Sequence, residues 1–112
     1  MFPNWSYIHN IIPGDVGRIW IVWKPHSVTI TELSKSDQHI MCEVKGSVHE
    51  HKDFCLSVIY GRNDKELRNS LWMQLKNDKL IVGDLPWIVG GDFNAVRYVE
   101  EALGGNLPIK QL

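Results

Sequence analysis

Three consecutive stretches decide the fold: FCLSVIY at residues 54–60, GRNDKELRNSLWMQLKNDKLIVG at residues 61–83 and PWIVGGDFN at residues 86–94. In the first, two sets of residues alternate, as on the two faces of a β-strand. In the second, leucine recurs every four residues, as on one face of an α-helix. The third opens with proline and a short apolar run before two glycines, which predicts a short buried strand that ends in a turn.

The predicted elements are a strand over 54–60, a helix over 64–82 and a strand over 87–91. Two strands joined through a helix are nearly always parallel, so the three elements form a β-α-β unit. Tyr60 and Asp92 then lie at the same, carboxyl ends of the two strands. Ligands bind at this edge of α/β sheets, which makes it the place to look for a site.

The predicted helix has recognisable ends. Asn63 is a good N-cap, and Glu66 three residues later gives a start of the capping-box type. Gly83 is a suitable stop at the carboxyl end. The apolar stripe between these ends consists of Leu67, Leu71, Trp72 and Leu75.

Further β-structure is predicted nearer the N-terminus. Residues 1–17 mix proline, glycine and asparagine with scattered apolar residues, which predicts an irregular lead-in. The run at 18–24 is apolar on both faces and predicts a strand buried on both sides. Pro25 ends this strand because it has no backbone donor. β-Branched residues at 28–31 resume the pattern after a hairpin or a corner.

An antiparallel pair is expected in the middle of the chain. Residues 39–45 alternate between two faces, as residues 54–60 do, and a polar connection at 46–53 joins them. The second face of the 39–45 run carries Glu43 and Lys45. We therefore predict two antiparallel strands with one face wetter than the other.

Composition bounds the class of protein. The chain has 112 residues, enough for one domain, and 12 basic against 13 acidic residues, which argues against nucleic-acid binding by bulk charge. Cys42 and Cys55 lie in strand-like runs and are expected to be reduced core thiols. The N-terminus shows no signal-peptide pattern, and the longest apolar run, 19–23, is far shorter than the ~20 residues that span a bilayer. We expect a soluble intracellular protein, nuclear or cytoplasmic.

The strongest local signal for chemistry is the pair Asp92 and Asn94 behind two glycines. Glycine allows backbone to approach a ligand closely. The Asp carboxylate can accept a proton from water or help to hold hydrated Mg²⁺, and the Asn amide can donate to a phosphate oxygen. The alternative is an Asx-type turn in which both side chains serve local backbone groups.

Other polar clusters are weaker candidates. His49 and His51 flank Glu50 near His39 and the two cysteines, but no CxxC or HxxxH spacing supports a zinc site. A turn at 14–17 lacks the Lys of a phosphate loop. Four cations flank the predicted site and are candidates for contacts with DNA phosphates: Arg62, Lys65, Arg68 and Arg97. Ordinary surface charge is the competing interpretation.

Taken in order, these motifs are similar to a known family. The succession Tyr60-x-x-Asn63, amphipathic helix, strand and Gly91-Asp92-x-Asn94 resembles the middle of the endonuclease/exonuclease/phosphatase (DNase I-like) superfamily. Further motifs resemble the nuclease domain of plant LINE-type (non-LTR) retroelements: GRIWIVW at 17–23, RNSLW at 68–72, Pro86-Trp87 and Gly104-Gly105. The resemblance runs from about Asn4 to Gly105.

The resemblance implies a fold and a chemistry. The family fold is a four-layer α/β sandwich, so residues 1–112 are expected to form one partial α/β (α+β) domain, mostly strands with one main helix. The family activity is Mg²⁺-dependent phosphodiester cleavage, with DNA as the partner in the retroelement branch. Asp92 matches the residue that orients or deprotonates water, Asn94 the one that binds the scissile phosphate, and Tyr60 a donor to phosphate oxygen. Asn63 matches the residue beside that tyrosine, and Arg62, which flanks the predicted site, is expected with Asn63 to bind phosphate.

The chain also departs from the family pattern. The family uses an Asn and a metal-binding Glu before the 17–23 motif and an Asp-His pair well after Gly-Asp-x-Asn, and no residue here stands in for them. Mg²⁺ usually needs one or two protein carboxylates, and Asp92 is the one expected. We therefore expect a fragment of a nuclease, of retroelement origin, that does not cleave on its own. Trp20 and Trp23 are expected to lie on uncovered sheet faces that favour self-association.

Two alternatives stay open. One is a catalytically dead module whose β-rich surface pairs with another polypeptide. The other is a fragment of a superfamily phosphatase that acts on sugar or lipid phosphates. The motifs at 68–72 and 104–105 favour the retroelement branch over the phosphatases.

Overall fold

The computed structural model describes residues 4–11, 18–46 and 53–94. These residues form a mostly-β α/β fold with one helix, which confirms the expected class. The elements, in chain order, are β1 (Ser6–His9), β2 (Trp20–Trp23), β3 (Val28–Lys35), β4 (His39–Gly46), β5 (Phe54–Tyr60), α1 (Lys65–Val82) and β6 (Trp87–Asp92).

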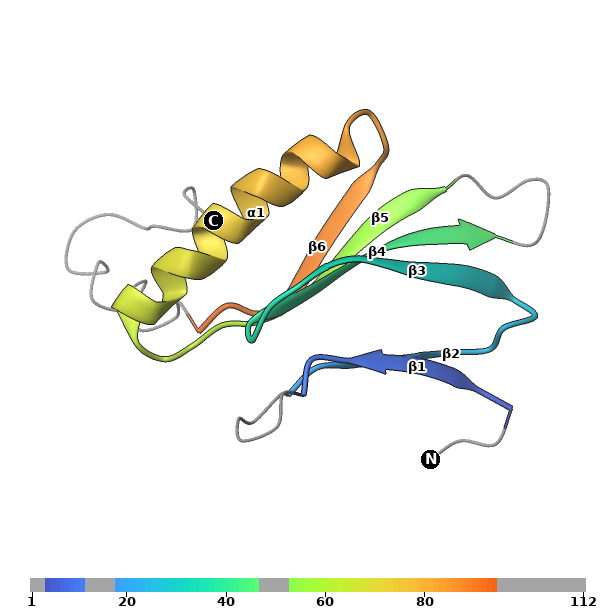
Figure 1. The fold of residues 1–112 in the computed structure, drawn as a ribbon, viewed down its shortest axis with the longest axis horizontal. Coiled ribbons are helices and arrows are strands. Elements are labelled where there is room, and N and C mark those ends of the chain that lie inside the picture. The colour runs from blue at the N-terminus through green and yellow to red at the C-terminus, as the bar shows by residue number, and fades with distance from the viewer. Residues whose placement is uncertain (1–3, 12–17, 47–52, 95–112) are drawn as a thin grey trace.

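The described strands make two sheets. β1 and β2 pair antiparallel in a small sheet, and the larger sheet has the order β3-β4-β5-β6. Its first three strands are antiparallel, whereas β5 and β6 are parallel. Figure 1 shows α1 lying along one face of the larger sheet and the β1–β2 pair on the other. The layers are therefore helix, large sheet and small sheet.

The β-α-β unit is confirmed. β5, α1 and β6 follow one another, and the parallel register pairs Tyr60 directly with Asp92. The prediction that β6 is a buried strand is wrong, because Ile88 is 54% exposed. β6 is the last strand of the sheet among the described elements, so only β5 flanks it. Trp87 and Val89 are half-buried, and Asp92 is exposed.

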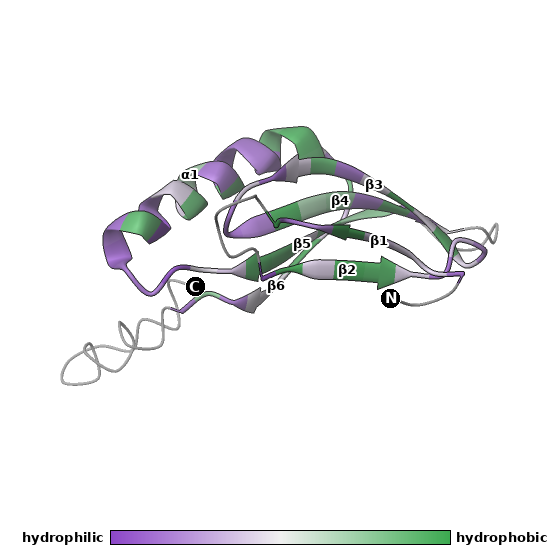
Figure 2. Ribbon diagram, turned by 60° about the horizontal axis from the view of Figure 1, so that its bottom comes forward, coloured by the Kyte–Doolittle hydropathy of each residue, from purple (hydrophilic) through white to green (hydrophobic). Residues whose placement is uncertain are grey.

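A core cluster fills the space between the two sheets. Its buried members come from β2, from the residue just before β2, and from β4. They are Ile19, Ile21, Ile40, Cys42 and Val44. Figure 2 shows hydrophobic residues concentrated in β2 and in parts of β4 and β5, with hydrophilic residues along much of α1. Burial of apolar side chains at about 25 cal/mol per Å² is the main force that holds the two sheets together.

The structure corrects two predictions for the N-terminal part and decides between the two alternatives of a third. The expected irregular lead-in contains a strand, Ser6–His9, which pairs with β2. β2 is buried on one face only: Ile21 lies in the core, but Trp20 is 40% exposed because none of the described residues covers that face. After β2 the chain turns a corner, since β3 joins the other sheet.

β4 is buried on both faces in its first half, and the face that carries Glu43 and Lys45 becomes the wetter one toward its end, in line with the prediction. Cys42 packs in the cluster between the sheets, and Met41 packs with Cys55 and Val82 under the helix. Both cysteines are free and buried, as expected. Burial raises the pKa of the Cys42 thiol to about 11 and also raises that of Cys55. Both thiols are therefore poor nucleophiles at neutral pH.

The N-cap and the first residue of the helix each lie one position later than predicted. Asp64 is the N-cap: its Oδ1 accepts hydrogen bonds from the backbone N–H of Glu66 at 2.8 Å and of Leu67 at 3.3 Å. Asn63 lies outside the helix. Gly83 ends it as predicted, with φ 60° and its N–H donating to the Lys79 carbonyl.

The predicted apolar stripe holds only in part. Leu71 is buried, but Leu67 is 53% exposed, and Arg68 takes a buried position instead. Arg68 can be buried because its guanidinium donates to the backbone carbonyls of Arg62 and Asn63. Of the described elements, no helix is both long and apolar enough to cross a membrane.

A buried polar pair joins α1 to the sheet. His39 at the start of β4 is fully buried, and its Nε2 lies 2.8 Å from Oδ2 of Asp78, which is 1% exposed. Among the described residues, neither oxygen of Asp78 has a well-directed hydrogen bond, so the approach to His39 is a close polar contact. Burial lowers the pKa of His39 more than the carboxylates of Asp78 and Asp37 raise it. His39 is therefore neutral in the folded chain at neutral pH.

This neutral histidine predicts a loss of stability in mild acid. The folded pKa of His39 lies below its unfolded value of 6.5, so the unfolded chain binds more protons between the two pKa values. The free energy of unfolding should fall as the pH drops below about 6.5, by up to about 1.4 kcal/mol per pH unit. Urea unfolding at pH 7.5, 6.5 and 5.5 measures this slope.

His39→Gln should remove the slope, whereas the variant of an exposed histidine, His26→Gln, should retain it. A wild-type stability that is flat or rises between pH 7.5 and 5.5 would contradict a neutral His39.

Candidate functional site

A cleft lies where sequence reasoning places the ligand edge, at the carboxyl ends of β5 and β6. Its volume is about 310 Å³. It is lined by Arg18, Asp37, Tyr60, Gly61, Arg62, Asn63, Asp64, Leu67 and Asn94. Four of the five predicted site residues line it, and the fifth, Asp92, is exposed beside it as the register partner of Tyr60.

The Asp92–Asn94 loop has the geometry of an Asx-type turn. Oδ1 of Asp92 accepts the backbone N–H of Asn94 at 2.8 Å, and Asn94 has a φ of 53°. The Asn94 side-chain amide donates to the Gly61 carbonyl, and the Gly61 N–H donates to the Asp92 carbonyl at 2.7 Å. These bonds tie the ends of β5 and β6 together. The Asn94 amide keeps a second N–H for another partner.

Close backbone packing explains a glycine in this loop. A Cβ on Gly61 would stand 2.5 Å from the carbonyl oxygen of Phe93, nearer than any real contact. The Phe93 ring stacks on Trp72 of α1, with 5.9 Å between ring centroids. The loop after β6 is therefore held against both β5 and the helix.

Tyr60 meets an arginine from the other sheet. The Arg18 guanidinium lies over the Tyr60 ring, 5.3 Å from its centroid, and Nη1 donates to the hydroxyl oxygen at 3.3 Å. Both side chains are exposed, where such a cation–π contact is worth about 0.5–1 kcal/mol. The sequence places Arg18 in a motif but does not mark it as a site residue. Its contact with Tyr60 arises from the packing of the sheets, which no local pattern encodes.

Arg62 is paired with a carboxylate. Its Nε and Nη2 lie 3.0 and 2.9 Å from Oδ2 of Asp37, in the turn between β3 and β4. Both side chains are about 40% exposed, so the pair contributes little stability, on the order of 0–1 kcal/mol. The contact neutralises the charge of Arg62, the predicted phosphate ligand. It also adds Asp37 to the site, a residue that the sequence did not indicate.

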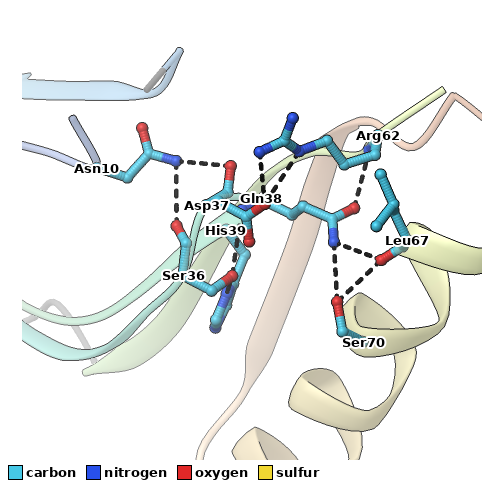
Figure 3. Close-up of polar contacts among 8 residues, drawn as sticks. All are labelled: Asn10, Ser36, Asp37, Gln38, His39, Arg62, Leu67 and Ser70. Atoms are coloured by element: carbon cyan, nitrogen blue, oxygen red, sulfur yellow. Dashed lines mark hydrogen bonds and ion pairs between the residues drawn. The ribbon is translucent and has the colours of Figure 1, made fainter. Parts of the chain in front are cut away.

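Gln38 holds together the backbone segments that carry the cleft residues (Figure 3). Its side chain is 1% exposed, and its Oε1 accepts the Arg62 backbone N–H at 2.8 Å. Its Nε2 donates to the Leu67 carbonyl at 2.9 Å and to Ser70 Oγ at 3.1 Å. Removal of such a buried amide leaves several polar groups unpaired, each at a cost of about 1–3 kcal/mol. Gln38 thus fixes the β3–β4 turn against the end of β5 and the helix.

Asn10 has the same role on the side of the small sheet. It is 1% exposed, and its Nδ2 donates to the carbonyls of Ser36 and Asp37, both at 3.1 Å. Its Oδ1 accepts the backbone N–H of Ile19 at 3.0 Å. One side chain therefore locks the backbone beside Arg18 to the turn that carries Asp37.

Asn63 is available to the cleft because it does not cap the helix. It is exposed at the cleft wall, and its backbone carbonyl accepts Nη1 of buried Arg68 at 2.7 Å. The same Nη1 lies 3.0 Å from the Arg62 carbonyl. Arg68 therefore supports the loop. It is not an exposed cation, either for DNA contact or as ordinary surface charge, which were the two interpretations that the sequence allowed.

The described residues do not fit a Mg²⁺ site. Asp37 is paired with Arg62, Asp64 caps the helix, and Oδ1 of Asp92 accepts a backbone bond. In the described ranges, no three His, Cys, Asp or Glu side chains gather as metal ligands would. The turn at 14–17, the histidines at 49 and 51, Arg97 and the glycine pair at 104–105 lie outside the described residues.

The glycines of β6 provide a test of this arrangement. Gly91 has a φ of 134°, and a Cβ there would run into the backbone of Ile59. Gly91→Ala should therefore destabilise the fold by about 1–3 kcal/mol. Gly90 has open space at its Cβ and ordinary φ, so Gly90→Ala should leave stability unchanged or raise it by about 0.4–1 kcal/mol. Urea midpoints by circular dichroism compare the two; equal effects would show that the strand can relax around either methyl group.

Comparisons of the chain with models of protein families, with curated proteins and with solved structures found no match. The interpretation of the cleft therefore depends on its own geometry and on the motifs that build it.

Proposed function

We propose that the chain is a segment of a DNase I-like phosphodiesterase domain that acts on DNA, of the kind found in plant LINE-type retroelements. The observation that carries the proposal is the register that sets Tyr60 opposite Asp92. Through it, Arg62, Asn63 and Asn94 come to one cleft at the carboxyl edge of the sheet. Residues that the motif places in separate stretches of sequence thus share a single site.

The chemistry of the cleft supports recognition of phosphate. A tyrosine hydroxyl, asparagine amides and arginine guanidinium are all donors to phosphate oxygen. The chain has a net charge of −1, so contact with DNA depends on this local set of donors and not on overall charge.

In this proposal the segment binds DNA weakly and does not cleave it. Cleavage in the family relies on Mg²⁺, and the carboxylates in and beside the cleft are each engaged with another group. Asp92 has one carboxylate oxygen beyond its local bond, which is a poor site for a cation that usually takes one or two protein carboxylates.

Binding and nicking assays test the proposal together. We expect a fluorescein-labelled 16-base-pair duplex to bind, as measured by fluorescence anisotropy. Tyr60→Phe and Asn63→Ala should each weaken binding by roughly tenfold, the equivalent of one hydrogen bond to phosphate. Asn69→Ala, an exposed asparagine elsewhere on α1, is the matched control and should bind as wild type does. Supercoiled plasmid with Mg²⁺ should remain intact.

Two results would contradict the proposal in different ways. Nicking that disappears in Asp92→Ala and in EDTA would show that these 112 residues build a working active site. DNA binding unchanged in Tyr60→Phe and Asn63→Ala would remove the cleft as the DNA site.

A second candidate function is a protein-interaction module, and one observation favours it. The outer face of the β1–β2 sheet carries aromatic rings in mutual contact: Tyr7 and Trp20 lie 5.4 Å apart, and His9 and Trp20 4.7 Å apart, between ring centroids. Tyr7 is 54% exposed and Trp20 40% exposed. Contiguous exposed aromatic surface is typical of association sites.

Self-association through this face has a direct test. Under this candidate, sedimentation velocity should show a dimer that forms with increasing concentration, and Trp20→Lys should raise the dissociation constant by at least roughly tenfold, the cost of a lost central aromatic contact. Leu80→Lys changes an apolar side chain that is 82% exposed on α1, in the opposite layer, and should have no effect. A monomer at all concentrations would exclude self-association through this face.

A further inference from the structure

We propose that Arg18 is a DNA-phosphate-binding residue of the cleft that acts together with Tyr60, an inference that rests on the proposed function. Arg18 comes from the approach to β2 in the small sheet, whereas Tyr60 ends β5 in the large sheet. The proposed phosphate site is therefore shared between the two sheets and is complete only when they pack together.

The charges around the cleft single out Arg18. Arg62 is held by Asp37 at 2.9 Å, and the guanidinium of Arg68 is buried against backbone carbonyls. Asp64 is occupied as the helix cap. The contacts of Arg18 are with Tyr60, and within the part of the chain that the structure describes it has no carboxylate partner. Among the described residues that line the cleft, Arg18 thus carries the positive charge that no carboxylate neutralises, and a bound anion can do so.

The geometry of the pair suits one phosphate. Nη1 of Arg18 donates to the Tyr60 hydroxyl oxygen, so the hydroxyl proton stays free to donate outward. The guanidinium has further N–H groups in a planar fork that matches phosphate oxygens. Two adjacent groups can therefore donate to the same anion, one charged and one neutral.

The backbone beside Arg18 is fixed although its side chain is exposed. Ile19, the next residue, is 3% exposed in the core, and its N–H donates to buried Asn10. Asn10 in turn holds the turn that carries Asp37. The guanidinium therefore starts from an ordered anchor, which lowers the entropy lost when it binds an anion.

The chain contains a matched control for this arginine. Lys24 follows the other end of β2, and its Nζ lies over the Trp5 ring at 5.2 Å, a cation–π contact of the same kind. The two residues are six positions apart in extended chain, so their Cα atoms lie up to about 20 Å apart. Lys24→Gln thus removes the same charge from the same strand region without touching the cleft.

The test is fluorescence anisotropy with the fluorescein-labelled 16-base-pair duplex in EDTA, from 50 to 200 mM KCl. Arg18→Gln should weaken binding roughly tenfold, as for one hydrogen-bonded phosphate contact. It should also reduce the slope of log K against log salt by about 0.9, the signature of one lost phosphate contact. Arg18→Lys should keep the slope but bind more weakly than wild type, because lysine lacks the planar fork. Lys24→Gln should change neither quantity.

Each other outcome overturns the inference. If Arg18→Gln binds with the wild-type affinity and slope while Tyr60→Phe binds weakly, Arg18 is no phosphate ligand, and the proposed function stands. If Arg18→Gln and Lys24→Gln weaken binding equally, general charge holds the DNA. If no variant changes binding, or the wild type does not bind, both the inference and the cleft as DNA site fail. Each variant should have the same thermal unfolding midpoint as the wild type, which confirms that a change in DNA binding does not come from a change in folding.

Discussion

The parallel pairing of β5 with β6, in the register that sets Tyr60 opposite Asp92, is the constraint on which the cleft depends. Two bonds across the strand ends lock this register: the Gly61 N–H donates to the Asp92 carbonyl, and the Asn94 amide donates to the Gly61 carbonyl. Both need the close backbone approach that a side chain at position 61 would prevent. A shift by one residue would move Asp92 away from Tyr60 and reverse the faces of the strand.

The β-α-β unit could be predicted because each of its signals is local. Strand alternation, a four-residue leucine spacing and a terminal glycine are all read within a few residues, and strands joined by a helix are then parallel. The cap was misplaced because Asn63 and Asp64 are both good caps, and tertiary contacts decide between them. Burial of β2 and β6 was overestimated for a related reason, since an apolar run does not say how many faces are covered.

The rest of the candidate site could not be predicted, because it depends on contacts between distant segments. Arg18 reaches Tyr60 across 42 positions, and Arg62 meets Asp37 across 25. Gln38 and Asn10 are ordinary polar residues in the sequence, and only the folded chain gives each three polar partners. A motif can thus indicate which residues carry chemistry, but the groups that neutralise, orient and support them are set by packing.

The two cysteines have a consequence for the dynamics of the molecule. Cys42 faces the cluster between the sheets and Cys55 the cluster beneath the helix, although they lie on neighbouring strands. Buried thiols become alkylated when their surroundings open. Labelling of Cys42 would record separation of the sheets, and labelling of Cys55 would record lifting of the helix. Each of the two interfaces therefore contains one thiol whose alkylation rate reports how often that interface opens. The ratio of the alkylation rates of Cys42 and Cys55 shows which interface opens more often.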